Sequence, residues 1–95
     1  YALKCMIGEC ARKYDSGEPA AVDAAMCKLF GIEATRRVSD QALFIHGGMG
    51  YEKSLPIERI YRDARSLWFE EGTPTVQKLV IGRDVLGKRI RQSGK

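Results

Sequence analysis

Residues 58–77 read ERIYRDARSLWFEEGTPTVQ and contain a helix end, a glycine turn and a new helix start. Gly72 suits a turn, and Thr73 followed by Pro74 is a typical cap and first residue of a helix. A carboxylate directly before such a turn can be aimed into a cleft instead of lying along a helix face. General bases are often held in this way, so Glu71 is a candidate catalytic residue.

A second interpretation of the same residues is purely structural. Glu70 and Glu71 would favour the N-terminus of the following helix through its dipole, which is worth a few tenths to about 1 kcal/mol. The tripeptide Glu71-Gly72-Thr73 does not by itself separate the two interpretations.

Outward from this stretch, the chain shows helical periodicity and no strand pattern. We predict a first helix that ends near Asp15 with Gly17 as its C-cap, a long helix from about Pro19 to about His46, a short helix opened by Pro56, and a last helix opened by Thr73 and Pro74. Gly31 within the long helix indicates close approach by a neighbouring helix. The fold class is therefore all-α. The expected inward residues are Leu3, Met6, Ile7, Cys10 and Tyr14; Ala25, Leu29, Ile32, Thr35, Ser39, Ala42 and Ile45; Ile57, Ile60, Tyr61 and Ala64; and Val76, Leu79, Val80, Leu86 and Ile90.

Ninety-five residues form one domain at most, and its core is thin. The formal net charge is +4, but the basic residues are interleaved with twelve acidic ones, so the composition does not favour a nucleic-acid partner. The clearest basic cluster is the tail, Lys88, Arg89, Arg91 and Lys95. No apolar run approaches the roughly 18 residues that a spanning helix needs. The apolar pattern of the first helix begins at the start of the chain without an N-cap residue before it. We therefore expect residues 1–95 to be a piece of a longer chain.

The cysteines and the single histidine indicate no metal site. Cys5, Cys10 and Cys27 match no zinc or redox spacing, and we expect buried thiols in a reducing compartment. His46 has no second histidine to share a metal. The expected location is the cytoplasm, or the mitochondrial matrix in a eukaryote.

Residues 46–51 read HGGMGY, with three glycines in four positions. The motif follows a helix and lacks the spacing of a dinucleotide fingerprint, which excludes a Rossmann site. Two interpretations stay open: an ordinary left-handed helix cap and turn, or phosphate binding by the backbone amides of a nearby helix start.

Taken in order, G-G-x-G-Y at 47–51, P-x-E-R-x-x-R-D-A-R at 56–65 and E-G-T at 71–73 resemble the C-terminal helical domain of the acyl-CoA dehydrogenase family. The resemblance covers essentially the whole chain, and residues 47–77 are its most specific part. It implies an up-and-down helical bundle, here incomplete because its first helix is missing or truncated. Residues 1–95 would be a C-terminal fragment that is inactive alone.

The resemblance implies FAD-dependent α,β-dehydrogenation of an acyl-CoA thioester, in which Glu71 removes the α-proton while hydride goes to flavin N5. A thioester α-proton is only weakly acidic, so the site must stabilise the charge that develops on the carbonyl oxygen. In the family, the backbone N–H of the base residue and a flavin ribitol hydroxyl do this. Gly72 is the implied substrate-binding neighbour.

The same resemblance assigns two FAD-contacting segments. One meets the ADP portion, commonly across a subunit interface, and consists of Phe44, Ile45, His46, Gly47 and Gly48. The other is Thr73, Pro74 and Thr75. Phe44 stands where the family often has glutamine, and Thr75 where glutamine or glutamate is common, so these two side chains would not make the usual hydrogen bonds.

The implied partners are the acyl-CoA substrate, electron-transfer flavoprotein as acceptor, and further copies of the chain in a dimer or tetramer. The alternative is a non-catalytic helical module for interaction or oligomerisation. An oxidase or desulfurising monooxygenase is a third reading, against which the intact Glu71-Gly72-Thr73 counts. Produced alone, the chain is expected to self-associate through an apolar seam on the long helix.

Overall fold

The computed structural model describes residues 1–94, without the side chains of residues 90–93. It contains α1 (Ala2–Asp15), α2 (Ala21–Ile45), the 3-10 helix η1 (Gly47–Tyr51), α3 (Ile57–Ser66) and α4 (Pro74–Ser93). Residues 1–94 contain no strand, which confirms the all-α prediction. The side chains of Ile90 and Arg91, and Lys95 as a whole, lie outside the described residues.

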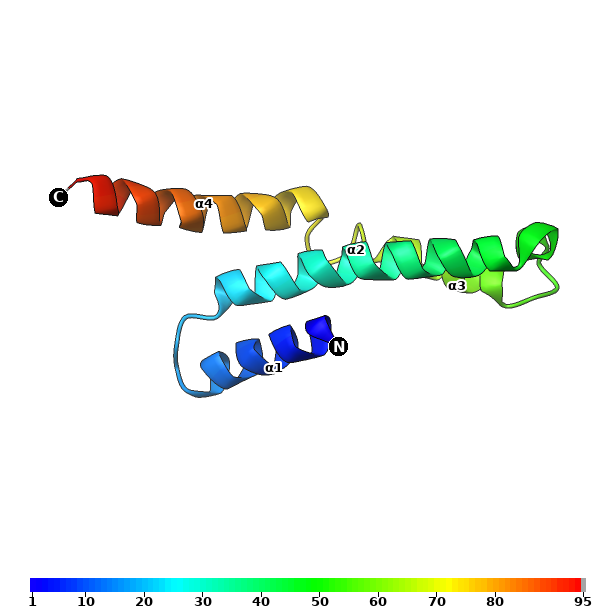
Figure 1. The fold of residues 1–95 in the computed structure, drawn as a ribbon, viewed down its shortest axis with the longest axis horizontal. Helices are drawn as coiled ribbons and strands as arrows, with labels where there is room; N and C mark the ends of the chain where they lie inside the picture. Colours follow the sequence, from blue (N-terminus) through cyan, green and yellow to red (C-terminus); the bar gives the residue numbers. More distant parts are fainter. Residues whose placement is uncertain (95) are drawn as a thin grey trace.

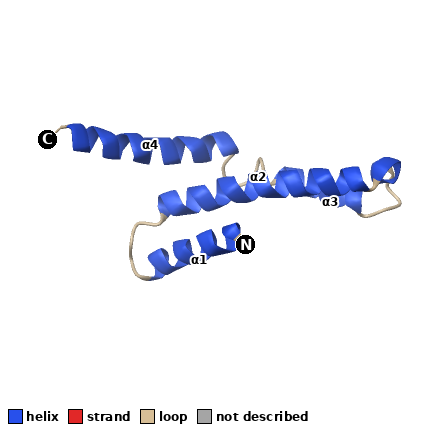
Figure 2. Ribbon diagram, viewed as in Figure 1, coloured by secondary structure: helices blue, strands red, loops and turns tan. Residues whose placement is uncertain are grey.

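The long helix α2 is the element on which the others pack. Helices α1, α3 and α4 each contact α2, and within the described residues they do not contact one another. As Figures 1 and 2 show, α1 runs back along one side of α2, while α3 and α4 follow one another along it in the opposite direction to α2. The bundle is therefore open in the described part of the chain.

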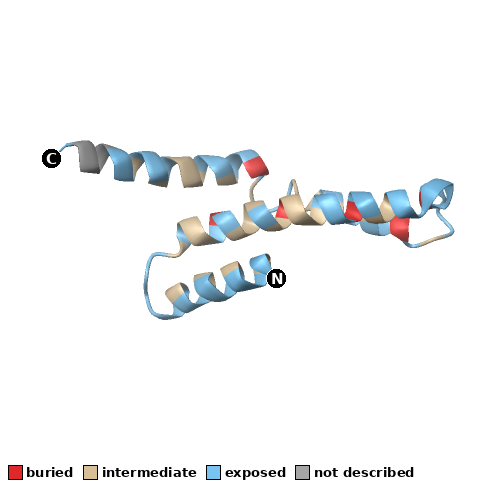
Figure 3. Cartoon of the chain, in the orientation of Figure 1, coloured by how far each residue is buried: buried red, intermediate tan, exposed pale blue. Residues whose placement is uncertain are grey.

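The molecule is elongated, with principal extents of 61 × 26 × 20 Å and a radius of gyration of 17.6 Å. A compact domain of this length would have a radius of gyration of roughly 12 Å. Among the described residues, the buried hydrophobic ones are Ala25, Ile32 and Ile57. Figure 3 shows the buried positions spread along α2 and at the starts of α3 and α4. The thin core expected from the chain length is confirmed.

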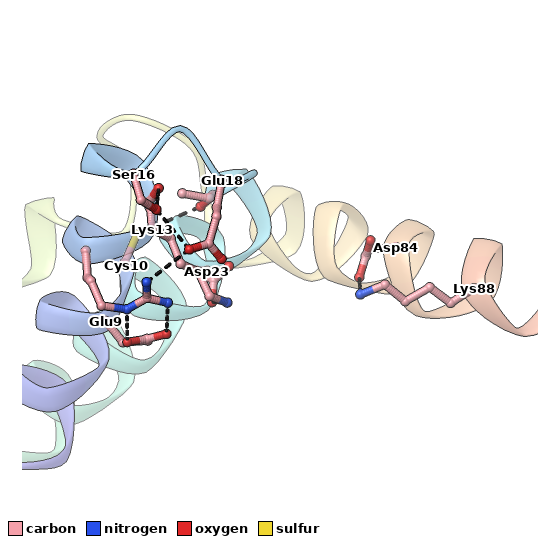
Figure 4. Close-up of polar contacts among 10 residues, drawn as sticks. Glu9, Cys10, Lys13, Ser16, Glu18, Asp23, Asp84 and Lys88 are labelled. Carbon is pink, nitrogen blue, oxygen red and sulfur yellow. Dashed lines mark hydrogen bonds and ion pairs between the residues drawn. The ribbon is translucent and has the colours of Figure 1, made fainter.

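Ion pairs hold the connection between α1 and α2 (Figure 4). Arg12 contacts Glu9 at 2.8 Å and Glu18 at 3.0 Å, and Lys13 Nζ lies 2.8 Å from Asp23 Oδ1. The Arg12 contact lowers the pKa of Glu9, and the Ser16 hydroxyl followed by Arg12 lowers the pKa of Glu18. Gly17, with φ of +77°, makes the left-handed turn that the sequence predicted after this helix.

Gly31 confirms the prediction of close helix approach. A Cβ placed there would lie 3.3 Å from Leu3 Cδ2, which is tighter than ordinary packing. The absence of a side chain at this position lets α1 and α2 meet.

Several predicted inward residues are exposed, which corrects the sequence-based faces. On α4 the less exposed side carries Gln77, Val80 and Asp84, while the apolar residues on its flank are exposed. The reason is that α4 contacts only one helix, so its apolar surface is wider than the contact. The same correction applies to Ile7 and Tyr14 on α1, Ile45 on α2, Ile60 on α3, and Val76, Leu79 and Leu86 on α4.

The prediction of three buried thiols was wrong in part. Cys5 is exposed, and Cys10 and Cys27 are half-buried. Burial, followed by the nearby Cys10, raises the pKa of the Cys27 thiol.

Candidate functional site

The turn between α3 and α4 has an unusual backbone. After Phe69, whose N–H donates to Ser66 O at 2.9 Å, the chain enters two consecutive left-handed residues, Glu71 with φ of +51° and Gly72 with φ of +98°. Glu71 is the single non-glycine residue with positive φ among those described. This conformation costs an L-residue about 1–2 kcal/mol, and such strain concentrates at functional sites.

Helix α4 begins as the sequence predicted. The N–H of Val76 donates to Thr73 Oγ1 at 3.3 Å, and the N–H of Gln77 donates to Thr73 O at 3.1 Å. Pro74 is buried at the first position of the helix. This cap fixes where the turn ends, so Glu71 stands three residues before the helix.

Glu70 and Glu71 are both exposed, as is Thr75. Both carboxylates precede the N-terminus of α4, where the helix dipole favours negative charge. The structural interpretation is compatible with this geometry, and it gives no reason for the positive φ of Glu71.

The side chain of Gln77 closes over the turn. Its Nε2 donates to Glu71 O at 3.3 Å and lies 3.5 Å from Gly72 O. The positive φ favours glycine at residue 72, and a Cβ there would lie 2.6 Å from that nitrogen and would displace the amide. Its position four residues after Thr73 places Gln77 in the first turn of α4, but no pattern in the sequence indicates this contact.

Trp68 anchors the segment that leads into the turn. The Arg65 guanidinium carbon lies 4.2 Å from the centre of the Trp68 ring, and that of Arg36 lies 5.7 Å away. These are cation–π distances, and they join α2 to the end of α3. The buried Nε1 of Trp68 has no hydrogen-bond partner among the described residues. Sequence spacing could suggest the Arg65 contact but not that of Arg36.

The glycine segment forms the short helix η1 instead of the predicted open loop. Gly47 has φ of +60°, which supports the left-handed cap interpretation, whereas Gly50 is buried and a Cβ there would lie 2.8 Å from Leu43 O. His46 Nδ1 donates to Ala42 O at 2.8 Å, since a carbonyl can only accept. No atom within 4 Å would obstruct a Cβ at Gly47 or Gly48, so the backbone there is open to an approaching group.

An open groove of about 1610 Å³ lies among α2, η1 and α3. Its lining combines aromatic rings with charged groups, and it includes Phe44 and Gly47 but none of residues 71–75. Phe44 and Ile45 are 78% and 81% exposed, so neither is committed to the core of the described chain.

The structure does not bring the two sets of predicted site residues together. Residues 71–75 lie beside the N-terminal half of α2, whereas residues 44–48 lie at its C-terminal end (Figure 1). Within one copy the two segments are separate.

The chemistry of both segments suits a dinucleotide such as FAD. At Gly47 and Gly48 no side chain stands between the backbone and an approaching group. The Thr73 hydroxyl accepts from Val76 N and has its own O–H as a donor. The groups that fit are therefore the uncovered glycine backbone and one hydroxyl, since Phe44 offers no polar atom.

Residues 1–94 contain no group of three histidine, cysteine or acidic side chains that could hold a metal ion. None of the helices described here is both long and apolar enough to cross a membrane.

Comparison with known proteins gives consistent similarities. Residues 1–86 match the family described as Acyl-CoA dehydrogenase, C-terminal domain. Acryloyl-CoA reductase (NADH) of Anaerotignum propionicum is 44% identical over 85 residues, covering 90% of this chain and 22% of that protein. The mitochondrial short-chain specific acyl-CoA dehydrogenase of Bos taurus is 46% identical over 72 residues, which cover 76% of this chain and 18% of that protein.

The structure of butyryl-CoA dehydrogenase from Megasphaera elsdenii aligns with a TM-score of 0.83 and 36% identity, covering 90% of this chain and 22% of that one. The chain thus spans about a fifth of the length of these relatives. With a family match over most of its length and the same fold, this chain belongs to the acyl-CoA dehydrogenase family and corresponds to its C-terminal domain.

Proposed function

We propose that the chain is the C-terminal domain of a longer flavoenzyme that dehydrogenates an acyl-CoA thioester, with Glu71 as the base that takes the α-proton. The observation that carries this proposal is the left-handed Glu71-Gly72 turn. This turn places the Glu71 carboxylate outside the two flanking helices, where it is exposed. The positive φ of Glu71 is not required for capping α4. The intact Glu71-Gly72-Thr73 in a member of this family supports the same role.

Two parts of Glu71 have separate tasks in this proposal. The carboxylate accepts the proton from the α-carbon, and the backbone N–H donates to the thioester carbonyl oxygen on which charge develops. Gly72 adds no side chain beside this residue, so the thioester can approach the backbone. Bound FAD would supply the acceptor for the β-hydrogen.

We further propose that FAD is held by residues 44–48 and 73–75 from different copies of the chain. The support is that the two segments are separate in one copy, with no side chain over the backbone at Gly47 and Gly48 and with Thr73 and Thr75 exposed. A dimer or tetramer would bring the glycine end of one α2 toward the turn of another copy. Electron-transfer flavoprotein as acceptor, and the cytoplasm or mitochondrial matrix as location, stay predictions.

The reverse reaction is a second candidate, because one relative at 44% identity is an acryloyl-CoA reductase. By microscopic reversibility, the group that removes the α-proton in oxidation delivers it in reduction. Glu71 therefore keeps its role in both directions. Rates with acyl-CoA plus a dye, against rates with enoyl-CoA plus NADH, distinguish the two.

The test is Glu71→Gln in the full-length protein. We expect FAD to stay bound, while oxidation of the best substrate from a panel of acyl-CoA thioesters falls about 10³-fold, within the range for loss of a general base. Glu70→Gln is the matched control, since it removes the adjacent exposed carboxylate, and its rate should stay near that of the parent. Near-normal turnover by Glu71→Gln would contradict the proposal.

The non-catalytic module makes a different prediction. A full-length protein that lacks the flavin absorbance bands, or that holds FAD but reduces it with no acyl-CoA, would favour an interaction or oligomerisation role.

A further inference from the structure

Gln77 makes contacts with the turn that its place in α4 does not require. It is half-buried in the first turn of the helix, and its own N–H already takes part in the helix start by donating to Thr73 O. The side-chain amide turns back instead, with Nε2 at 3.3 Å from Glu71 O and 3.5 Å from Gly72 O. A carboxamide nitrogen carries two hydrogens, which matches these two acceptors.

The two accepting carbonyls belong to the two left-handed residues. An L-residue such as Glu71 favours negative φ, so the peptide on its C-terminal side tends to rotate away from the observed geometry. A donor on each carbonyl opposes that rotation. Both contacts are at the long end of the hydrogen-bond range, so each is weak, and their main effect is to orient the two carbonyl groups.

The absence of a side chain at Gly72 makes room for this amide. A Cβ there would lie 2.6 Å from Gln77 Nε2, so the amide would have to move away. Glycine at residue 72 therefore lets the amide of Gln77 reach the two carbonyls.

We propose that Gln77 is a positioning residue: by holding the carbonyls of residues 71 and 72 it keeps Glu71 left-handed, with carboxylate and N–H both aimed at the substrate. The inference rests on the proposed function of Glu71 as base. In this proposal Gln77 acts through the backbone of Glu71 and Gly72 and not on the substrate directly.

The test compares Gln77→Met with Lys78→Met in the full-length enzyme. Methionine keeps the length of glutamine and removes both donors, and Lys78 is an exposed neighbour on α4 without a role in the site. The first readout is exchange of the substrate α-proton into D2O, followed by NMR. The second is the separation of kcat from KM, and the third is φ of residue 71 in a crystal structure of the variant.

For Gln77→Met we expect α-proton exchange and kcat to fall about 10- to 100-fold, the effect of a misplacement near 1 Å. KM and FAD content should stay near the parent values, and residue 71 should leave the left-handed region. Lys78→Met should match the parent throughout. If Gln77→Met does not accumulate as folded protein, Gln77→Glu is assayed in its place, since a carboxylate has the same length and no donor.

Glu71→Gln is measured in parallel to separate the two hypotheses. If Glu71→Gln exchanges normally, the base assignment and the positioning role both fail. If Glu71→Gln loses exchange while the Gln77 variants equal Lys78→Met, only the positioning role is overturned. The same holds if residue 71 stays left-handed in the Gln77 variants.

Discussion

At the scale of single residues, the φ of +98° at Gly72 is unfavourable for an L-residue. A Cβ there would also displace the flexible end of the Gln77 side chain, which releases the amide from the turn. We expect Gly72→Ala in the full-length enzyme to destabilise the turn by about 1–2 kcal/mol and to lower kcat. Thermal unfolding and steady-state kinetics measure the two effects.

Gly82→Ala is the control for this prediction. Gly82 is within α4, has no positive φ, and a Cβ there would meet nothing within 4 Å. Alanine in a helix should be neutral or stabilising by up to about 1 kcal/mol. Equal behaviour of the two alanine variants would mean that the turn tolerates a Cβ.

At the scale of elements, the contact of Trp68 with α2 decides how firmly the end of α3 is held. Trp68→Ala removes a half-buried ring and two cation–π contacts, and we expect local destabilisation of about 2 kcal/mol. This equals roughly a 30-fold rise in the opening equilibrium. Hydrogen exchange of peptides covering residues 57–72 in the full-length protein measures it.

Trp68→Phe is the informative partner of that variant. It keeps a ring beneath Arg65 and removes the buried N–H that has no partner among the described residues. Because an unsatisfied buried donor carries a desolvation penalty, exchange in Trp68→Phe should stay close to that of the parent. Exchange as fast as in Trp68→Ala would show that Nε1 has a partner which matters.

How much of each element could be predicted depended on how local its cause is. The start of α4 was readable because Thr73 and Pro74 act on the next three residues, and Gly17 signalled its own turn. The packed face of α4 was not readable, since periodicity finds apolar residues but not the helix that covers them. For the same reason, Glu71 could be singled out from its neighbours, while its left-handed φ and the amide of Gln77 required the folded turn.

At the scale of the molecule, α2 presents a second apolar stripe that no described element covers. Met26, Phe30, Val38, Phe44 and Ile45 are exposed and share about a third of the helix circumference, on the side away from Ala25 and Ile32. Their number and spacing confirm the apolar seam that the sequence predicted on this helix. An exposed apolar stripe of this kind is expected to be covered by another protein surface.

Residues 1–95 produced alone should therefore self-associate in a concentration-dependent way, measured by light scattering. Added salt should strengthen association, because it screens the net charge of +4 while leaving apolar contacts intact. The double variant Phe30→Lys and Val38→Lys should reduce the average mass without loss of helical circular dichroism, since both residues are exposed on α2. A monomer at every concentration, with full helical content, would mean that this stripe stays exposed to solvent without driving association. The copies that we propose to share FAD would then have to contact one another through another surface.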